Sequence, residues 1–262
     1  MKPKEKGNGR RAGQRWVAVA GRRPVLEALA AGRPIREIWL AEGAHGRAAG
    51  EIEQAAEARG VRVVRVPRRE IDARAPLAVH QGVVAYVQAI EYAPLEVLLE
   101  RAKGAGPGLL LVLDGIEDPQ NLGALIRTGD AAGVHGVVIG KHRAAGLTEA
   151  AVKASAGAAY HVPVAQVTNI ARTLDLLKEE GFWTVAASPE GDRTLWDVDF
   201  TVPTAVVVGS EGKGLSRLVE ERCDVRARLP MAGAVSSLNA SVAGALFLFE
   251  AVRQRRSGAG ST

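Results

Sequence analysis

The stretch "LLLVLDGIEDPQNLGALIRTGDAAGVHGVVIG", residues 109–140, decides the fold class of this chain. It predicts an apolar strand over 109–114, a helix that opens near Pro119 and stops at Gly133, and a second apolar strand over 134–140. Short apolar strands joined by helices build a mainly parallel sheet that is covered on both faces. The sequence therefore predicts an α/β fold here.

The same alternation continues toward the end of the chain. Helical and strand patterns follow one another at 148–157, 162–167, 168–181, 182–188, 204–210 and 225–230, and a last helix runs from about Ser237 to Arg256. Residues 108–257 are thus predicted to form one α/β domain. Ligands on such sheets bind beyond the carboxyl ends of the strands, so candidate chemistry is expected there.

A smaller α/β domain is predicted before it, over residues 16–90. Its helical and strand patterns lie at 22–32, 35–41, 48–60, 61–67 and 80–90. Residues 91–107 hold a short helical pattern and a Gly-Pro-Gly break, which we interpret as a linker. The basic tail 1–15 and residues 258–262 are expected to be disordered.

Composition is typical of a folded protein of the cytoplasm. Of the 262 residues, 47% are hydrophobic and 24% are charged, and no apolar run approaches the roughly 18 residues needed to cross a bilayer. The basic start is followed by no apolar signal core, so we expect a cytoplasmic protein without a membrane partner. The single cysteine, Cys223, leaves no internal disulfide and is interpreted as a gap-filling residue rather than a nucleophile.

Basic residues gather in short clusters. The formal net charge is +5 and the pI is about 9.6. Besides the N-terminal tail, clusters lie at 21–24, 65–70 and 253–256, which indicates a partner that carries phosphate. Charge alone does not separate RNA from DNA or from a membrane surface. The histidines lack the spacing of metal ligands, so no metal is predicted.

Three segments at strand ends carry the candidate chemistry, and the first is "DGIEDPQNLGALIRTG" over 114–129. Asn121 and Arg127 are separated by about 600° of helical rotation and roughly 9 Å of rise. They do not share a helix face, so they reach one ligand only if it is large or if Asn121 lies on the entry loop. A capped helix with a surface arginine explains this segment equally well.

The second segment, "VVVGSEGKGL" over 206–215, runs from a strand into glycines. Gly209, Gly212 and Gly214 permit tight turns and a close approach of the backbone to a ligand. The spacing matches neither of the glycine-rich phosphate fingerprints, and Glu211 argues further against a polyphosphate cradle. This carboxylate would suit the orientation of an arginine or contact with a cation.

The third segment, "RLPMAGAVSSLNASVAG" over 228–244, opens the last helix. Ser236, Ser237 and Asn239 can cap the free backbone N–H groups of the helix start, and the same groups can instead bind a ligand. Small residues from Ala232 to Ser237 leave the backbone uncovered, as in the wall of a pocket. Gly244 within the helix indicates close packing.

Together, in this order, the three segments resemble the motifs of the SpoU branch of the SPOUT methyltransferases. The likeness covers the whole second domain, while the first domain resembles the ribosomal-protein-L30e-like RNA-binding module. The combination is most similar to bacterial guanosine 2′-O-methyltransferases of 23S ribosomal RNA. The resemblance implies S-adenosylmethionine as cofactor, a C-terminal trefoil knot that periodicity does not reveal, and a homodimer with the active site at its interface.

The resemblance also assigns site residues. It implies that S-adenosylmethionine is held by Gly209, Ser210, Glu211, Gly214, Leu229, Pro230, Met231, Ser237, Leu238 and Asn239. It implies Arg127 as the central catalytic residue, with Asn121, Glu211, Ser237 and Asn239 around it. Because a guanidinium with a pKa above about 12 is a poor resting base, we expect Arg127 to hold a phosphate and stabilise a developing alkoxide, oriented by Glu211.

RNA recognition is expected from Arg22, Arg23, Arg68 and Arg69, with His80 and Gln81 as weaker candidates. Each arginine taken singly is better explained as a solvated surface side chain than as an RNA contact. Other functions stay open: a transfer-RNA D-loop methyltransferase, an adenosine methyltransferase, or a catalytically idle RNA-binding protein. A nicotinamide oxidoreductase is disfavoured because no glycine fingerprint opens an early helix.

Overall fold

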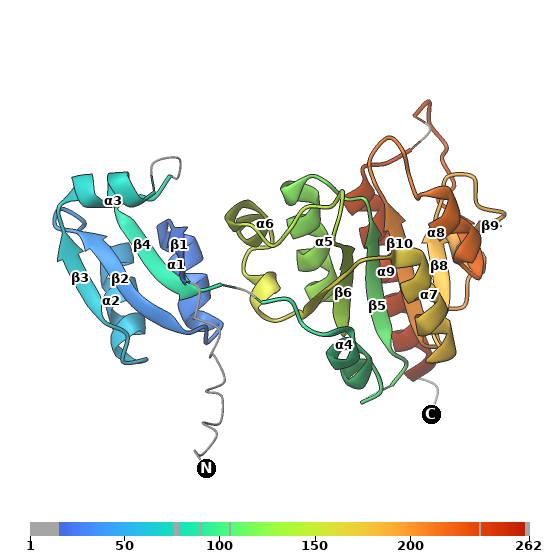
Figure 1. Ribbon diagram of the computed structural model, residues 1–262, viewed down its shortest axis with the longest axis horizontal. Helices are drawn as coiled ribbons and strands as arrows, with labels where there is room; N and C mark the ends of the chain where they lie inside the picture. Colours follow the sequence, from blue (N-terminus) through green and yellow to red (C-terminus); the bar gives the residue numbers. More distant parts are fainter. Residues whose placement is uncertain (1–15, 76–78, 90, 105, 236, 260–262) are drawn as a thin grey trace, which may run out of the picture. The chain divides into compact units, whose positions relative to one another are not determined.

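The computed structural model describes residues 16–75, 79–89, 91–104, 106–235 and 237–259. The tail 1–15, expected to be disordered, lies outside the described residues. The chain divides into two compact units between Ala89 and Ile90 (Figure 1).

The first unit is a small mixed sheet with helices. Its strands follow the order β1 (Trp16–Ala20), β4 (Val83–Gln88), β2 (Ile35–Ala41) and β3 (Val63–Val66), and only the pair of β2 and β3 is parallel. Its helices are α1 (Arg22–Ala30), α2 (Arg47–Glu57) and α3 (Arg68–Arg74). Helix α3 was not predicted, because Ile71 is its one buried side chain and a single apolar residue makes no periodic signal.

The second unit holds a parallel sheet of seven strands within the described residues. The strands follow the order β7 (Val164–Val167), β6 (Gly136–Gly140), β5 (Leu109–Asp114), β10 (Thr204–Gly209), β8 (Trp183–Ala187), β11 (Val225–Arg228) and β9 (Arg193–Thr194). All of the pairs are parallel, so the carboxyl ends of the strands lie at one edge of the sheet. The predicted α/β architecture is confirmed.

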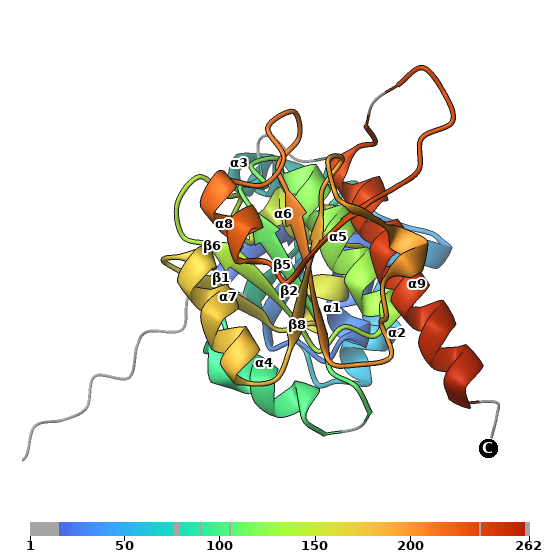
Figure 2. The same cartoon turned by 90° about the vertical axis from the view of Figure 1, so that its right-hand side faces the viewer.

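Helices cover both faces of this sheet (Figure 2). One face packs against α5 (Pro119–Ala132), α6 (Glu149–Ala154) and α9 (Ala240–Ala259), and the other against α4 (Leu95–Ala102), α7 (Ile170–Glu179) and α8 (Arg217–Arg222). Short 3-10 turns lie at Ala158–Tyr160 and Leu195–Asp197. Alternate residues of β5 enter opposite cores, Leu111 on the α5 side and Leu110 on the α4 side. Both faces of the central strands are therefore buried away from solvent, which explains their unbroken apolar sequence.

Two boundaries differ from the sequence-based expectation. Residues 91–107 were interpreted as a linker, but they carry α4, whose Leu98 and Leu99 are buried in the core of the second unit. The apolar face of this helix supplies burial that a free linker lacks. At the other end, α9 continues to Ala259, into the segment expected to be disordered, and 260–262 lie outside the described residues.

Glycines let α5 approach its neighbours closely. A Cβ on Gly123 would lie 2.4 Å from the carbonyl oxygen of Ala151 in α6. A Cβ on Gly244 of α9 would lie 2.6 Å from Cδ2 of Leu125 in α5. The packing reason expected for Gly244 is thus confirmed, and α5 is fixed between two helices.

We predict that Gly123→Ala destabilises the second unit by about 1–3 kcal/mol, because the new methyl group meets backbone atoms that cannot rotate away. Gly50→Ala is the matched control, since Gly50 is also inside a helix but has open space around its Cβ position. It should stabilise by about 0.5–1 kcal/mol through helix propensity. Urea unfolding followed by circular dichroism measures both, and equal effects would contradict the packing argument.

Candidate cofactor pocket and active site

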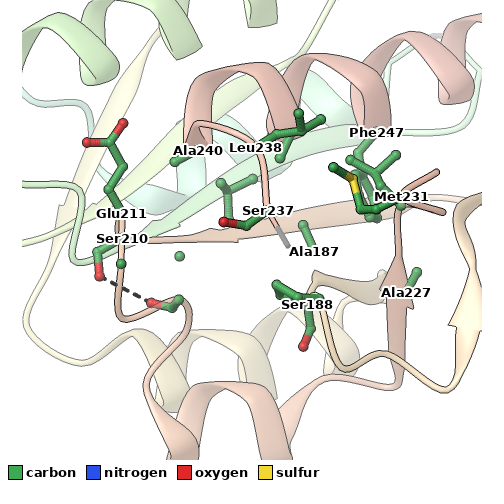
Figure 3. Close-up of a pocket in the computed structure, with 17 residues that line it drawn as sticks. Ala187, Ser188, Ser210, Glu211, Ala227, Met231, Ser237, Leu238, Ala240 and Phe247 are labelled. Carbon is green, nitrogen blue, oxygen red and sulfur yellow. Dashed lines mark hydrogen bonds between the residues drawn. The ribbon is translucent and has the colours of Figure 1, made fainter. Parts of the chain in front are cut away.

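A cavity opens at the carboxyl ends of β8, β10 and β11, beside the first turns of α9 (Figure 3). Ser210 and Glu211 lie at one end of the labelled group, and Met231 and Phe247 lie together at the other. The lining consists of Ala187, Ser188, Pro189, Val208, Gly209, Ser210, Glu211, Gly212, Gly214, Ala227, Leu229, Met231, Ser237, Leu238, Ala240, Ala243 and Phe247. Small and apolar residues with few polar groups are typical of a pocket for a small organic ligand.

The loop after β10 folds back on itself. Ser210 N donates to Gly214 O and Gly214 N donates to Ser210 O, each at 2.9 Å. A Cβ on Gly209 would lie 2.2 Å from the carbonyl carbon of Gly214, so only glycine fits there. Gly212 and Gly214 have left-handed φ values of 76° and 66°. Backbone atoms therefore form this wall of the cavity, and we call residues 209–214 the glycine loop.

Most of the residues predicted to hold the cofactor line this one cavity. They are Gly209, Ser210, Glu211, Gly214, Leu229, Met231, Ser237 and Leu238, whereas Pro230 and Asn239 do not line it. The segments converge because β8 lies between β10 and β11 in the sheet, which brings three strand ends together. Sequence reasoning missed Ser188 and Pro189 at the end of β8, although a strand ending in "AASP" at the same edge was a usable signal.

The last helix begins at Ala240, after the position near Ser237 that its pattern indicated. Asn239 caps it, because its Oδ1 accepts from Ser241 N at 2.8 Å and from Ser241 Oγ at 2.5 Å. Ser237 and Leu238 therefore precede the helix and line the cavity instead. Ser236 lies outside the described residues.

Asn121, Glu211 and Asn239 form one hydrogen-bonded cluster. Asn121 Nδ2 donates to Glu211 Oε1 at 2.7 Å, and Asn239 Nδ2 donates to Asn121 Oδ1 at 3.2 Å and also to Glu211 Oε1. Asn121 is buried, and the other two residues are exposed. The carboxylate thus joins α5, the glycine loop and the start of α9 through charge-assisted hydrogen bonds.

Arg127 lies outside this cluster. It is exposed on α5, does not line the cavity, and has no hydrogen bond or ion pair to any other described residue. Asn121 is also inside α5 rather than on an entry loop, so the six-residue spacing turns the two side chains to different faces. The expected orientation of Arg127 by Glu211 is absent in the single chain, because Glu211 Oε1 accepts from the two amides.

The arginines predicted to bind RNA lie in the first unit. Arg22 and Arg23 open α1, and Arg68 and Arg69 open α3. Arg23 pairs with Glu27 at 3.0 Å. Arg68 and Arg69 are exposed and have no ion pair to another residue of the described ranges. Arg22, which is half-buried, has no such pair either, so Arg22, Arg68 and Arg69 are left available to a phosphate.

The weaker RNA candidate His80 has a structural role. It is buried, and its Nδ1 accepts from Gly82 N at 3.1 Å. The other ring nitrogen, Nε2, is thereby left to donate to Asp72 Oδ1 at 2.7 Å. Its neighbour Gln81 is exposed with a left-handed φ of 50°.

The basic cluster at 253–256 largely serves the fold, which corrects its interpretation as a phosphate-binding cluster. Arg253 pairs with Glu250 at 2.7 Å. Burial lowers the pKa of Arg255. The guanidinium of Arg255 donates to the backbone oxygens of Phe200, Pro107, Gly108 and Val202, at distances from 2.8 to 3.1 Å. These hydrogen bonds connect the last turns of α9 to the loops that precede β5 and β10.

Among the described residues, no group of three or more His, Cys, Asp or Glu side chains could hold a metal ion. None of the helices described is long and apolar enough to cross a membrane. Cys223 Sγ donates to Val219 O at 3.3 Å, and burial raises the pKa of the Cys223 thiol to about 12. Such a thiol is inert at neutral pH.

Comparison with known families identifies the chain. Residues 108–249 match the SpoU rRNA Methylase family, and residues 18–93 match "RNA 2'-O ribose methyltransferase substrate binding". The chain belongs to the SpoU rRNA methylase family. A curated relative, "Putative TrmH family tRNA/rRNA methyltransferase YacO" of Bacillus subtilis, is 46% identical over 90% of this chain and 95% of its own length.

Solved structures of SpoU proteins resemble this chain over 63% to 96% of its length. The methyltransferase AviRb from Streptomyces viridochromogenes, in complex with AdoMet, has a TM-score of 0.75 and 30% identity over 96% of this chain and 95% of its own. An AdoMet-bound rRNA methyltransferase from Sinorhizobium meliloti has a TM-score of 0.74 and 27% identity, with coverages of 91% and 87%. The TrmH/SpoU tRNA modifying enzyme of A. aeolicus has a TM-score of 0.54 and 32% identity, and covers 63% of this chain and 84% of its own.

The protein is an RNA 2′-O-ribose methyltransferase of the SpoU family that uses S-adenosylmethionine. Its cavity fits this cofactor on two grounds. The glycine loop has no side chain at Gly209, Gly212 and Gly214, so backbone lines this wall of the cavity, as suits a cofactor held by main-chain groups. Leu229, Met231 and Phe247 supply an apolar wall for the uncharged part of the molecule.

We predict that Gly209→Ala weakens binding of S-adenosylmethionine at least roughly tenfold, because the added Cβ would force the glycine loop open. Isothermal titration calorimetry with the full-length protein measures the affinity. Gly233→Ala, after β11, is the matched control because nothing lies within 4 Å of its Cβ position. Unchanged affinity in Gly209→Ala would show that the loop does not form the cofactor wall.

Proposed function

We propose that this enzyme methylates the 2′-hydroxyl of a guanosine ribose in 23S ribosomal RNA. The single observation that carries the choice of ribosomal RNA is the first unit, which matches the substrate-binding family over 18–93. The rRNA methyltransferase from S. meliloti covers 91% of this chain, whereas the tRNA enzyme of A. aeolicus covers 63%. An added RNA-binding unit suits a large folded RNA, which is recognised by shape and by single-stranded elements.

Mapping of the modified nucleotide tests this substrate. Primer extension at low nucleotide concentration on ribosomal RNA from a deletion strain should lose one stop, which returns when the gene is restored. Loss of a stop in the D-loop of a transfer RNA would favour the tRNA alternative. An adenosine at the lost stop would correct the base, and no lost stop in either RNA would favour an idle RNA-binding protein.

In the proposed mechanism, the residues of this chain activate and position a weak nucleophile. When bound, S-adenosylmethionine supplies an electrophilic methyl group. A ribose hydroxyl is a poor nucleophile at neutral pH, so it must be aimed in line and its developing negative charge stabilised. Arg127 is exposed and unpaired among the described residues, which leaves its guanidinium available to an RNA phosphate and to the developing alkoxide.

The cluster of Asn121, Glu211 and Asn239 is proposed to position the site. Its hydrogen bonds hold the glycine loop against α5 and the start of α9. Glu211 thereby acts on the loop rather than on Arg127 within one chain. Ser237 is proposed to contact the cofactor or the ribose from the opposite wall. Arg22, Arg23, Arg68 and Arg69 are proposed to contact RNA phosphates.

A homodimer is proposed from the surface of α9. Val242, Leu246 and Phe249 are 47%, 40% and 48% exposed. Their spacing places them on one face of the helix. A continuous apolar stripe on an exposed helix is typical of a protein–protein interface. The trefoil knot, the L30e-like character of the first unit and the cytoplasmic location stay predictions.

We predict that Arg127→Ala lowers methyl transfer by about 10²–10³-fold while the affinity for S-adenosylmethionine changes little, because Arg127 does not line the cofactor cavity. Transfer of a tritiated methyl group to total bacterial RNA measures the rate, and calorimetry measures the affinity. Arg127→Lys should recover part of the rate, since it keeps the charge but loses the planar fork. Strong residual transfer in Arg127→Ala would remove Arg127 from the mechanism.

We predict that Leu246→Glu converts a dimer to a monomer, because the substitution buries a charge in the proposed interface. Light scattering coupled to size-exclusion chromatography measures the mass. Leu176→Glu on α7 is the matched control, since Leu176 is 39% exposed and Leu246 is 40% exposed. A monomeric wild-type protein, or loss of the dimer in both variants, would contradict an interface at α9.

A further inference from the structure

A second cavity lies next to the cofactor cavity in the second unit. It opens at the carboxyl ends of β5, β6 and β7 and at the start of α7. Ser210 and Gly214 line both cavities, so the two are separated only by the glycine loop. A ligand in the second cavity would therefore lie one loop away from the cofactor.

Cationic side chains collect in this second cavity. Lys141 and Arg143 follow β6, and Lys213 extends from the glycine loop. All three are exposed, and none has an ion pair with another residue in the described parts of the chain. His142 adds a further hydrogen-bond donor between the first two. The cavity thus offers several positive charges that the protein itself does not neutralise.

Carboxylates in the same cavity leave these cations available. Asp114 and Glu117 also line it, yet neither has an oxygen within 4.0 Å of Lys141, Arg143 or Lys213. Asp114 Oδ2 instead accepts from Ser216 N at 2.7 Å.

The backbone at Arg143 is also unusual. Its φ is 51°, in the left-handed region that residues with a Cβ rarely adopt. Strained backbone persists where the surrounding structure enforces it, and it gathers at functional sites. The turn is held from both sides, by Lys141 N donating to Val167 O at 2.8 Å and by Ala145 N donating to Ile116 O at 2.7 Å. Arg143 is therefore presented from a fixed turn.

We propose that Lys141, Arg143 and Lys213 bind phosphates of the substrate RNA in this second cavity and thereby position the target ribose beside the glycine loop. The inference deepens the proposed function and rests on it for the identity of the ligand as RNA. Every ribose inside an RNA chain has a phosphate on each side, so a phosphate held one loop from the cofactor fixes the neighbouring sugar. Such contacts position the chain without reading its sequence.

The first test is the salt dependence of RNA binding. Full-length Lys141→Gln/Arg143→Gln and the wild type are compared by filter binding to a labelled transcript of bacterial large-subunit ribosomal RNA. The slope of log K against log salt is negative, and each lost phosphate contact reduces its magnitude by about 0.7–0.9. We expect the magnitude of this slope to be smaller by roughly 1.5 in the double variant, and its affinity for the RNA to fall roughly tenfold at moderate salt.

Two control variants separate an effect of the second cavity from a general effect of net charge. Lys103→Gln removes one positive charge at the amino ends of the strands and should leave the slope unchanged, because it breaks only an exposed pair with Glu180. Glu117→Gln removes a negative charge inside the second cavity and should strengthen RNA binding roughly two- to threefold. A general effect of net charge would instead move Lys103→Gln and the double variant together.

Kinetics and cofactor binding complete the test. The double variant should raise KM for total bacterial RNA roughly tenfold, with an unchanged calorimetric affinity for S-adenosylmethionine. An unchanged slope and KM would overturn the proposal, and so would a loss of cofactor affinity, which would mean that the substitutions act through the glycine loop. If the wild type bound RNA but methylated none, the proposed function would fail while the salt slope still tested the second cavity.

Discussion

The close contact between Gly209 and the backbone of Gly214 is the constraint on which the site depends. The central strand β10 ends at Gly209, and the chain then doubles back so tightly that no side chain fits between the two glycines. Paired backbone hydrogen bonds between Ser210 and Gly214 lock the turn. Because three of the six residues of the turn are glycines, backbone forms this wall of the cavity, and Glu211 lies within the turn.

The glycine loop also joins the two halves of the sheet edge. Glu211 is tied to Asn121 on one helix and Asn239 before another, so α5, the loop and α9 hold one another in register. The cofactor cavity lies at the ends of β8, β10 and β11, and the basic cavity lies at the ends of β5, β6 and β7. The cofactor cavity and the proposed phosphate site thus lie next to each other, on either side of the glycine loop.

Local patterns predicted the elements well where burial is strong and periodic. The unbroken apolar runs of β5 and β10 and the amphipathic α5 lie where the sequence indicated, because both faces of the sheet are covered. Helix α3 was not predicted, because its one buried side chain, Ile71, gives no helical periodicity in the sequence. The sequence placed the start of α9 near Ser237, whereas the helix begins at Ala240. Asn239, and not Ser237, is its N-cap residue, because Asn239 Oδ1 accepts hydrogen bonds from Ser241.

The sequence by itself determined the α/β class and the glycines of the turn, because these follow from local periodicity and backbone freedom. The residues of the cofactor wall were implied by the resemblance to the SpoU family. Only the tertiary structure decided that β8 lies between β10 and β11, which places Ser188 in the lining of the cofactor cavity. It also decided that the guanidinium of Arg255 donates to backbone carbonyls. It also decided that Glu211 bonds two asparagines rather than Arg127. Such pairings join residues far apart in the chain, and no local pattern records which of several polar side chains will meet.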